Sequence, residues 1–187
     1  MLATIEEQGK LTEELKLQIL AAETLVVVED LYRPYRPKRR TRATIAKEKG
    51  LEPLAALITL QKTKVPIEEA AKSYISEEKE VKTAGEAING AKDIIAEYIS
   101  DEADYRIYIR DLTAKQGKIT SIAKDAQTES VYEMYYEFEE PITKLAGHRI
   151  LALNRGEKEK ILTVKVEAPE ERILQYLEKK VISSDNV

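Results

Sequence analysis

The chain has 187 residues, enough for one domain, or two small ones, with a buried core. Its 34 acidic and 30 basic side chains give a net charge of −4, which argues against a globally basic nucleic-acid-binding domain. The absence of cysteine excludes disulfides and thiolate metal sites. No apolar run approaches the roughly 18 residues that a membrane span needs, and the first residues do not resemble a signal peptide. We therefore expect a cytoplasmic protein with no membrane partner.

Two helices are predicted at the start of the chain. Thr12 can cap the first, with Glu13 and Glu14 favourably placed in its first turn. The second should cover about residues 22–31, although the β-branched run Val26-Val27-Val28 would by itself favour a strand. The flanking pattern favours a helix.

The stretch over residues 31–44 is the most informative part of the sequence. It reads Leu-Tyr-Arg-Pro-Tyr-Arg-Pro-Lys-Arg-Arg-Thr-Arg-Ala-Thr, with six basic side chains among tyrosines and prolines. Guanidinium groups pair bidentately with phosphate, and tyrosine rings can stack on bases. The candidate nucleic-acid contacts are therefore Arg33, Arg36, Lys38, Arg39, Arg40, Arg42, Tyr32 and Tyr35.

A structural interpretation of the same stretch stays open. Pro34 and Pro37 fix the backbone φ angle and remove hydrogen-bond donors, which is typical of an extended connector between helices. In such a connector the charges would simply remain solvated. Positive charge concentrates near residues 33–49, whereas acidic residues gather at 77–80 and 129–140. Any binding of nucleic acid should therefore come from this one patch.

Helical signals continue after the basic stretch. Thr44 begins a short helix that Gly50 can close in a left-handed conformation. Pro53 and Pro66 suit the first turns of the next two helices, and the first of these should end near Gln61.

The clearest helix of the sequence starts at residue 83. Thr83 and Glu86 form a capping-box pair. Ser100 restarts the chain into another helix, which should end near Gly117. The buried stripe of the first helix should consist of Ala87, Ile88, Ala91, Ile94, Ile95 and Tyr98.

Two stretches depart from helical periodicity. Residues 118–124 and 161–167 alternate apolar and polar side chains, as strands do, and could pair as a small ribbon. Helices are predicted over the remaining segments, 132–138, 142–145, 149–155 and 170–181. The predicted fold class is all-α, an irregular multi-helix array with helix-turn-helix-like elements and the small β ribbon as an option.

The chain is predicted to have two regions. Residues 1–82 form an N-terminal helical region with the basic connector, and residues 83–187 form a second helical region with the minor β element. The two regions could also pack as one unit.

Aromatic composition is unusual, with ten tyrosines, one phenylalanine and no tryptophan. Four of the rings lie close together in sequence, at Tyr132, Tyr135, Tyr136 and Phe138, and could form a stacking surface for single-stranded nucleic acid. The glutamates around them would repel phosphate. We therefore interpret these rings as core and interface residues.

Catalytic chemistry finds little support. His148 is the only histidine, so neither a two-histidine metal site nor a conventional proton relay can be assembled. No nucleophile lies in a Gly-x-Ser-x-Gly motif, and no Gly-rich phosphate loop is present. We expect a protein that is not an enzyme and has no cofactor and no metal site.

Four segments of the chain carry a family resemblance. The longest covers residues 29–54 and includes the basic stretch; the others cover residues 5–11, 86–97 and 148–157. In the same order, these segments resemble the Tex family of bacterial transcription accessory proteins, which is related to a eukaryotic elongation factor that also chaperones histones. The resemblance covers nearly the whole chain.

The resemblance implies that the chain is a fragment. A full-length family member is several-fold longer, with an RNase H-like domain, a helix-hairpin-helix element and a C-terminal OB-fold RNA-binding domain after this region. The main RNA affinity of the family is attributed to that OB-fold domain. We therefore expect RNA or DNA to bind only weakly to this fragment, with transcription machinery as a further possible partner.

Three functional hypotheses stay open. The chain could be a helical scaffold that assists nucleic-acid binding in transcription through the basic stretch. It could be a protein-interaction module that docks through acidic faces and exposed tyrosines. It could also be purely architectural, with its arginines paired to carboxylates such as Glu29 and Asp30 and to helix C-termini.

Overall fold

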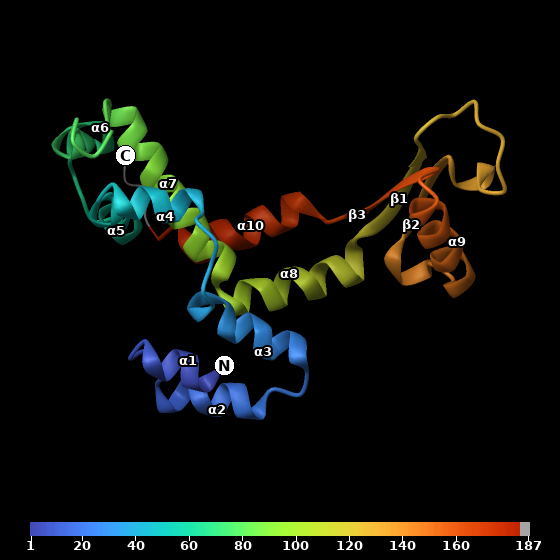
Figure 1. Ribbon diagram of the computed structural model, residues 1–187, viewed down its shortest axis with the longest axis horizontal. Coiled ribbons are helices and arrows are strands. Elements are labelled where there is room, and N and C mark those ends of the chain that lie inside the picture. The colour runs from blue at the N-terminus through green and yellow to red at the C-terminus, as the bar shows by residue number, and fades with distance from the viewer. Residues whose placement is uncertain (184–187) are drawn as a thin grey trace. The chain divides into compact units, whose positions relative to one another are not determined.

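The computed structural model describes residues 1–183 of the chain. These residues form ten α-helices and one three-stranded antiparallel sheet (Figure 1), so a mostly helical fold with a small β element is confirmed. They divide into two compact units: unit 1 contains residues 1–107 and the described residues from 177 onward, and unit 2 contains residues 108–176. None of the described helices is long and apolar enough to cross a membrane.

Unit 1 begins with three short helices, α1 (Leu2–Glu7), α2 (Glu13–Ala21) and α3 (Leu25–Tyr32). Thr12 caps α2 as predicted, because its hydroxyl accepts a hydrogen bond from the Leu15 N–H at 3.1 Å. Thr24 caps α3 in the same way, so this helix starts later than the sequence suggested. The valine run is nevertheless helical, since β-branching lowers helix propensity only slightly.

The core of unit 1 lies where the longest helix, α7, meets three shorter ones. The bounds are Arg42–Glu48 for α4, Glu52–Leu60 for α5, Ile67–Ala71 for α6 and Ala84–Asp101 for α7. A 3₁₀ turn, Lys72–Tyr74, follows α6.

Five of the six residues of the predicted stripe of α7 supply one side of this core; the sixth, Tyr98, is 46% exposed and lies outside it. Ala87, Ala91 and Ile94 are completely buried, whereas Ile88 and Ile95 pack at the edge of the core. The buried residues opposite them are Ala43, Ala46, Leu51, Leu54, Ala55, Ala71 and Val81.

Two glycines permit this arrangement. Gly50 has a φ of +77° and follows α4 in the predicted left-handed conformation. At Gly90 of α7, an added Cβ would lie 2.4 Å from Leu51 Cδ1 and 3.3 Å from Ala46 Cβ. The missing side chain therefore lets α7 approach its neighbours closely.

The predicted capping pair is present at the start of α7. The Glu86 N–H donates to Thr83 Oγ1 at 3.1 Å, and the Glu86 carboxylate accepts from the N–H of Lys82 at 2.7 Å, one residue before the cap. Pro53 lies in the first turn of α5 as predicted. Pro66 occupies the N-cap of α6, one position earlier than predicted.

The end of α5 holds the C-terminal part of unit 1. Gln61 follows this helix in a left-handed conformation, and its Nε2 donates to the carbonyl of Val181 at 2.7 Å. Its Oε1 accepts from the N–H of Ser183 at 2.9 Å. Val181 is the last residue of α10 (Glu170–Val181), which, like α8 (Ala103–Gln116), has residues in both units.

Unit 2 is built on a sheet with the strand order β2-β1-β3. Both predicted strands are confirmed, and they pair antiparallel with Ser121 opposite Val164. Helix α9 packs against β3. The bounds are Lys118–Ala123 for β1, Glu137–Pro141 for β2, Leu162–Glu167 for β3 and Gly147–Lys158 for α9.

The helices predicted over 132–138 and 142–145 are wrong. Glu133–Tyr135 and Ile142–Lys144 form single 3₁₀ turns, and β2 lies between them. Because β2 carries three glutamates in five residues, its intrinsic strand signal is weak. It is a strand because it pairs with β1 along its length.

The clustered tyrosines belong to the core of unit 2, as we interpreted them. Tyr132 and Tyr135 are 5% exposed and pack with Leu153 and Leu162. Tyr135 meets Phe138 edge-to-face, with ring centroids 5.3 Å apart. These rings are therefore not available as a stacking surface for bases.

The predicted regions 1–82 and 83–187 stay a sequence prediction. In the structure, Val81 and Ala87 lie on either side of that boundary and belong to one core.

Ile94→Ala should destabilise unit 1 by about 2–5 kcal/mol, because it opens a cavity in the core around α7. Leu20→Ala, at a side chain that is 66% exposed, should change stability by less than about 0.5 kcal/mol. Urea unfolding followed by circular dichroism measures both variants. Amide hydrogen exchange of Ile94→Ala should lose protection in α4, α5 and α7 and keep it in β1, since unit 2 has a separate core; equal loss in β1 would contradict two cores.

Candidate nucleic-acid interface

The predicted contact residues lie between α3 and α4. Tyr32 is the last residue of α3, Arg33–Tyr35 form a 3₁₀ turn, and Arg42 is the first residue of α4. Residues 36–41, here named the connector, have no regular secondary structure. Arg36 is extended with ψ 131°, as the residue before a proline prefers. A connector between helices is thus present at residues 36–41, with Arg36 and Thr41 extended, whereas Pro34 lies in a 3₁₀ turn.

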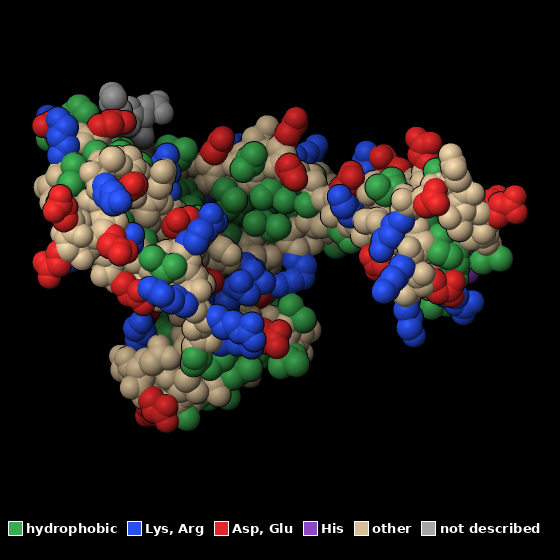
Figure 2. Space-filling view, turned by 45° about the horizontal axis from the view of Figure 1, so that its top comes forward, with side chains coloured by type: hydrophobic (Ala, Val, Ile, Leu, Met, Phe, Trp, Pro, Cys, Tyr) green, Lys and Arg blue, Asp and Glu red, His purple; other side chains and the backbone are tan. Residues whose placement is uncertain are grey.

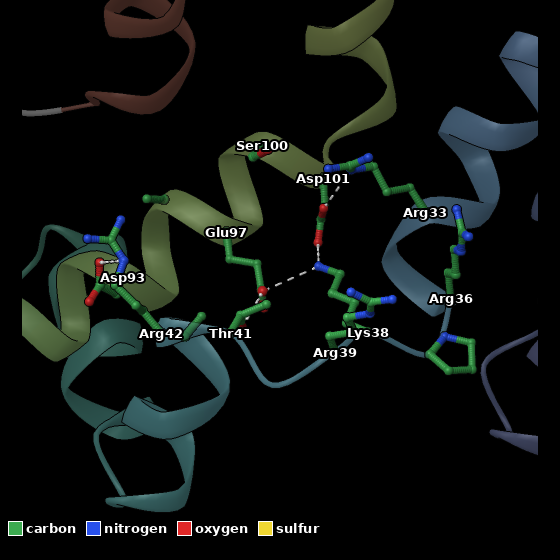
Figure 3. A pocket seen from close by; sticks show the side chains of 13 residues that line it. Arg33, Arg36, Lys38, Arg39, Thr41, Arg42, Asp93, Glu97, Ser100 and Asp101 are labelled. Atoms are coloured by element: carbon green, nitrogen blue, oxygen red, sulfur yellow. Dashed lines mark hydrogen bonds and ion pairs between the residues drawn. The ribbon is translucent and has the colours of Figure 1, made fainter.

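Acidic side chains of α7 hold the first part of this segment. Glu97 and Asp101 are one turn apart and therefore share a face of the helix (Figure 3). Asp101 accepts a hydrogen bond from Arg33 Nε at 3.1 Å and also pairs with Lys38 Nζ. Lys38 Nζ lies 3.5 Å from Glu97 Oε1, so this lysine bridges two carboxylates.

The end of the connector is held through Thr41. Its hydroxyl caps α4 by accepting from the N–H of Thr44 at 3.1 Å, and it donates to Glu97 Oε1 at 3.0 Å. The side chains of Glu97 and Asp101 are only 16% and 10% exposed. Salt screens such partly buried contacts less than surface pairs, so they can fix the path of the connector.

Two arginines of the stretch make only peripheral ion pairs. Arg40 lies 2.8 Å from Glu48, and both side chains are exposed. Arg42 Nε lies 3.6 Å from Asp93 Oδ1, with the arginine side chain 87% exposed. Exposed pairs of this kind contribute about 0–1 kcal/mol, so both guanidinium groups remain largely available to other anions.

A groove of about 700 Å³ lies between the connector and α7 (Figure 3). Arg36 and Arg39 line it, and neither has a carboxylate partner within residues 1–183. Figure 2 shows lysine and arginine side chains gathered on the surface of unit 1 around this region. The charged side chains of the groove are five bases and three acids, an excess of two positive charges: Arg33, Arg36, Lys38, Arg39 and Arg42 with Asp93, Glu97 and Asp101.

A second groove, of about 640 Å³, shares part of this lining and differs in character. It contains two aromatic side chains, Tyr35 and Tyr98. Its charges balance, with four bases and four acids: Lys10, Arg36, Lys38 and Lys47 with Glu52, Glu97, Asp101 and Glu102.

Tyr98 lines this second groove and is 46% exposed. Its hydroxyl donates to Glu52 Oε1 at 2.7 Å, and Lys47 Nζ lies 4.6 Å from the ring centroid. Burial, together with the hydrogen bond to Glu52, raises the pKa of Tyr98 to about 12. Tyr98 is therefore a neutral hydrogen-bond donor at physiological pH.

Five of the six predicted bases line the groove, including Arg42 at the start of α4. The sixth, Arg40, lies outside it. Tyr35 lines the second groove only, and Tyr32 lines neither. The acids that contact the stretch were missed. Asp93, Glu97 and Asp101 repeat every four residues, a signal that could have suggested an acidic helix face.

The proposed partners of the arginines also differ from the sequence hypothesis. Asp30, which we considered as a partner of the stretch, is 3% exposed and pairs with Arg106 Nε of α8 at 2.7 Å. Glu29 is exposed. Arg33 pairs with Asp101, which lies 68 residues further along the chain. Within the part of the chain that the structure describes, no group of histidine, aspartate and glutamate side chains is placed to hold a metal ion.

Comparison with known proteins finds a family and several relatives that this chain is similar to. Residues 61–185 match the model of the Tex central region-like family. Uncharacterized protein YdcI of Bacillus subtilis is 56% identical over 183 residues, which is 96% of this chain and 26% of that protein. Protein tex of Bordetella pertussis is 42% identical, with 89% of this chain and 21% of the relative covered. Transcriptional accessory protein Tex of Neisseria gonorrhoeae is 37% identical, with 88% and 22% covered.

The chain thus belongs to the Tex family, as the four sequence segments indicated. It spans about a quarter of the length of the relatives it matches.

Asp101→Asn should destabilise unit 1 by about 1–3 kcal/mol, because Arg33 and Lys38 lose a charged acceptor in a partly buried place. Asp93→Asn, which removes the same charge from a pair whose arginine is 87% exposed, should cost about 0.5 kcal/mol or less. Urea unfolding measures both. Equal costs for the two variants would contradict a structural role that is specific to Asp101.

Proposed function

We propose that this chain is the helical scaffold portion of a Tex-like transcription accessory protein, and that its basic groove assists the binding of nucleic acid. The observation that carries the proposal is the pair Arg36 and Arg39, two guanidinium groups that line the groove without a carboxylate partner among the described residues. Guanidinium is well suited to phosphate, because its planar N–H groups can donate two parallel hydrogen bonds.

The charge balance supports a local and weak interaction. The chain as a whole is negative, so its general field does not attract nucleic acid. The groove has an excess of two positive charges, which would contact few phosphates. In a complete family member such a patch would add to other contacts with RNA or DNA, and the transcription machinery could supply further partners.

Helices α4 and α5 are the part of the scaffold that we propose to be helix-turn-helix-like. Three residues, 49–51, join them, and Gly50 lies in the middle of that turn with a positive φ. A turn of three or four residues that contains glycine is typical of this motif. The proposal includes no catalytic activity for this region, and it places the protein in the cytoplasm.

The architectural alternative has its own support. Arg33 and Lys38 are committed to Asp101, and Lys38 and Thr41 are committed to Glu97. These contacts stabilise the fold whether or not a ligand binds. On this second hypothesis the basic stretch only fastens α3 and α4 to α7.

Arg36→Glu combined with Arg39→Glu separates the two hypotheses. Neither arginine has an ion pair to lose, so the variant should stay folded by circular dichroism. Binding of labelled single-stranded RNA and of duplex DNA, titrated at low salt and at physiological salt, should weaken by about tenfold or more at low salt. The slope of log K against log salt on duplex DNA should become shallower by about 2, as expected for two lost phosphate contacts.

Two controls make the result specific. Lys62→Glu with Lys64→Glu makes the same charge change at exposed positions of unit 1 outside the groove, and it should affect binding much less. Arg40→Glu tests the neighbouring arginine that does not line the groove. Absence of binding by the unmodified chain at low salt, or equal losses in test and control variants, would favour the architectural hypothesis.

A further inference from the structure

Aromatic side chains and excess positive charge lie in different grooves of unit 1. Within the described part of the chain, no aromatic side chain lines the groove that contains Arg39 and Arg42. Tyr35 and Tyr98 line the second groove, where acidic and basic side chains are equal in number. Lys47 Nζ lies over the ring of Tyr98, which is 46% exposed, and the Tyr98 hydroxyl donates a hydrogen bond to Glu52. Arg36 lines both grooves, but a base that entered the cationic groove beside Arg39 and Arg42 would find no ring in its lining.

From this separation we propose that the groove is a preformed site for the phosphodiester backbone, which binds without stacking on bases. Arg36 and Arg39 would contact the phosphates. This inference rests on the proposed function and adds the part of the nucleic acid that is recognised. Such a site differs from single-strand binding sites in which stacking on aromatic rings supplies much of the affinity.

The site is preformed because α7 holds the backbone on both sides of the two arginines. Asp101 pairs with Arg33, before the connector, and with Lys38, which lies between Arg36 and Arg39. Glu97 accepts from Thr41, at the end of the connector. On the other side, Gln8 Nε2 donates to the carbonyl of Tyr35 at 2.7 Å. Fixing the backbone in this way lowers the entropy that would be lost when a phosphate binds.

An abasic oligonucleotide tests the first part of the inference. The 187-residue chain is titrated at low salt with a single strand of deoxyribose phosphate that lacks bases and with a poly-dT strand of equal length. The two dissociation constants should agree within about threefold, because base stacking contributes about fivefold or more per base where it occurs. A larger loss with the abasic strand would overturn backbone recognition. If neither strand binds, the proposed function fails and this inference fails with it.

If Asp101 positions the arginines, removal of its negative charge should weaken phosphate binding, although charge removal alone would strengthen it. Asp101 and Asp93 both line the groove, so simple charge removal predicts that Asn at either position tightens phosphate binding. If Asp101 positions the arginines, Asp101→Asn should instead weaken binding by about threefold or more, whereas Asp93→Asn should leave it unchanged or tighter. Binding by Asp101→Asn that equals or exceeds that of Asp93→Asn would overturn the positioning role.

The salt dependence of binding reports the number of phosphate contacts and so distinguishes loss of positioning from loss of folding. A partly unfolded sample lowers the fraction of active protein without changing the slope of log K against log salt. A loosened connector makes fewer simultaneous phosphate contacts, so the slope for Asp101→Asn should become shallower by about 1. Asp101→Glu, which keeps the carboxylate, should restore part of the lost affinity and slope; an unchanged slope in Asp101→Asn would contradict positioning.

Discussion

The carboxylates of Glu97 and Asp101 on α7 are the constraint on which the arrangement of unit 1 around the connector depends. The connector contains Pro37 and has no regular secondary structure, so it cannot fix its path through its own backbone hydrogen bonds. Here the path is fixed from outside, by ion pairs to Arg33 and Lys38 and a hydrogen bond to Thr41. Because these acids are mostly buried, the contacts are stronger than those of exposed pairs such as Arg40 with Glu48.

The same contacts divide the basic residues into two classes. Arg33 and Lys38 pair with Asp101 inside the fold, whereas Arg36 and Arg39 have no carboxylate partner among the described residues. Counting basic residues in the sequence therefore overestimates the patch. The groove has an excess of two positive charges, against the six that the stretch suggests when it is considered alone.

The surrounding architecture explains why α7 can play this part. One face of the helix is buried through Ala87, Ala91 and Ile94, with Gly90 allowing close approach to Leu51 and Ala46. A helix anchored so firmly is a rigid support for side chains on its neighbouring face. Unit 2 achieves its own stability differently, with tyrosine rings packed behind a small sheet.

The sequence by itself determined the local features of this protein. Caps at Thr12 and Thr83, the left-handed Gly50, the buried stripe of α7 and two alternating strands could all be predicted, because each depends on residues within a few positions of one another. The long motif around residues 29–54 also identified the family.

Only the tertiary structure decided which long-range partners meet. Strand β2 has little strand propensity of its own and forms by pairing with β1. The pairing of Arg33 with Asp101 joins residues 68 positions apart, and periodicity along one helix cannot reveal which distant cation lies beside it. Arg39 and Arg42 line a groove without tyrosines, whereas Arg36 also lines the groove that contains Tyr35, and this distribution likewise has no signature in the sequence. Side-chain neighbours in sequence can face different surfaces once the backbone path is fixed by contacts from elsewhere in the fold.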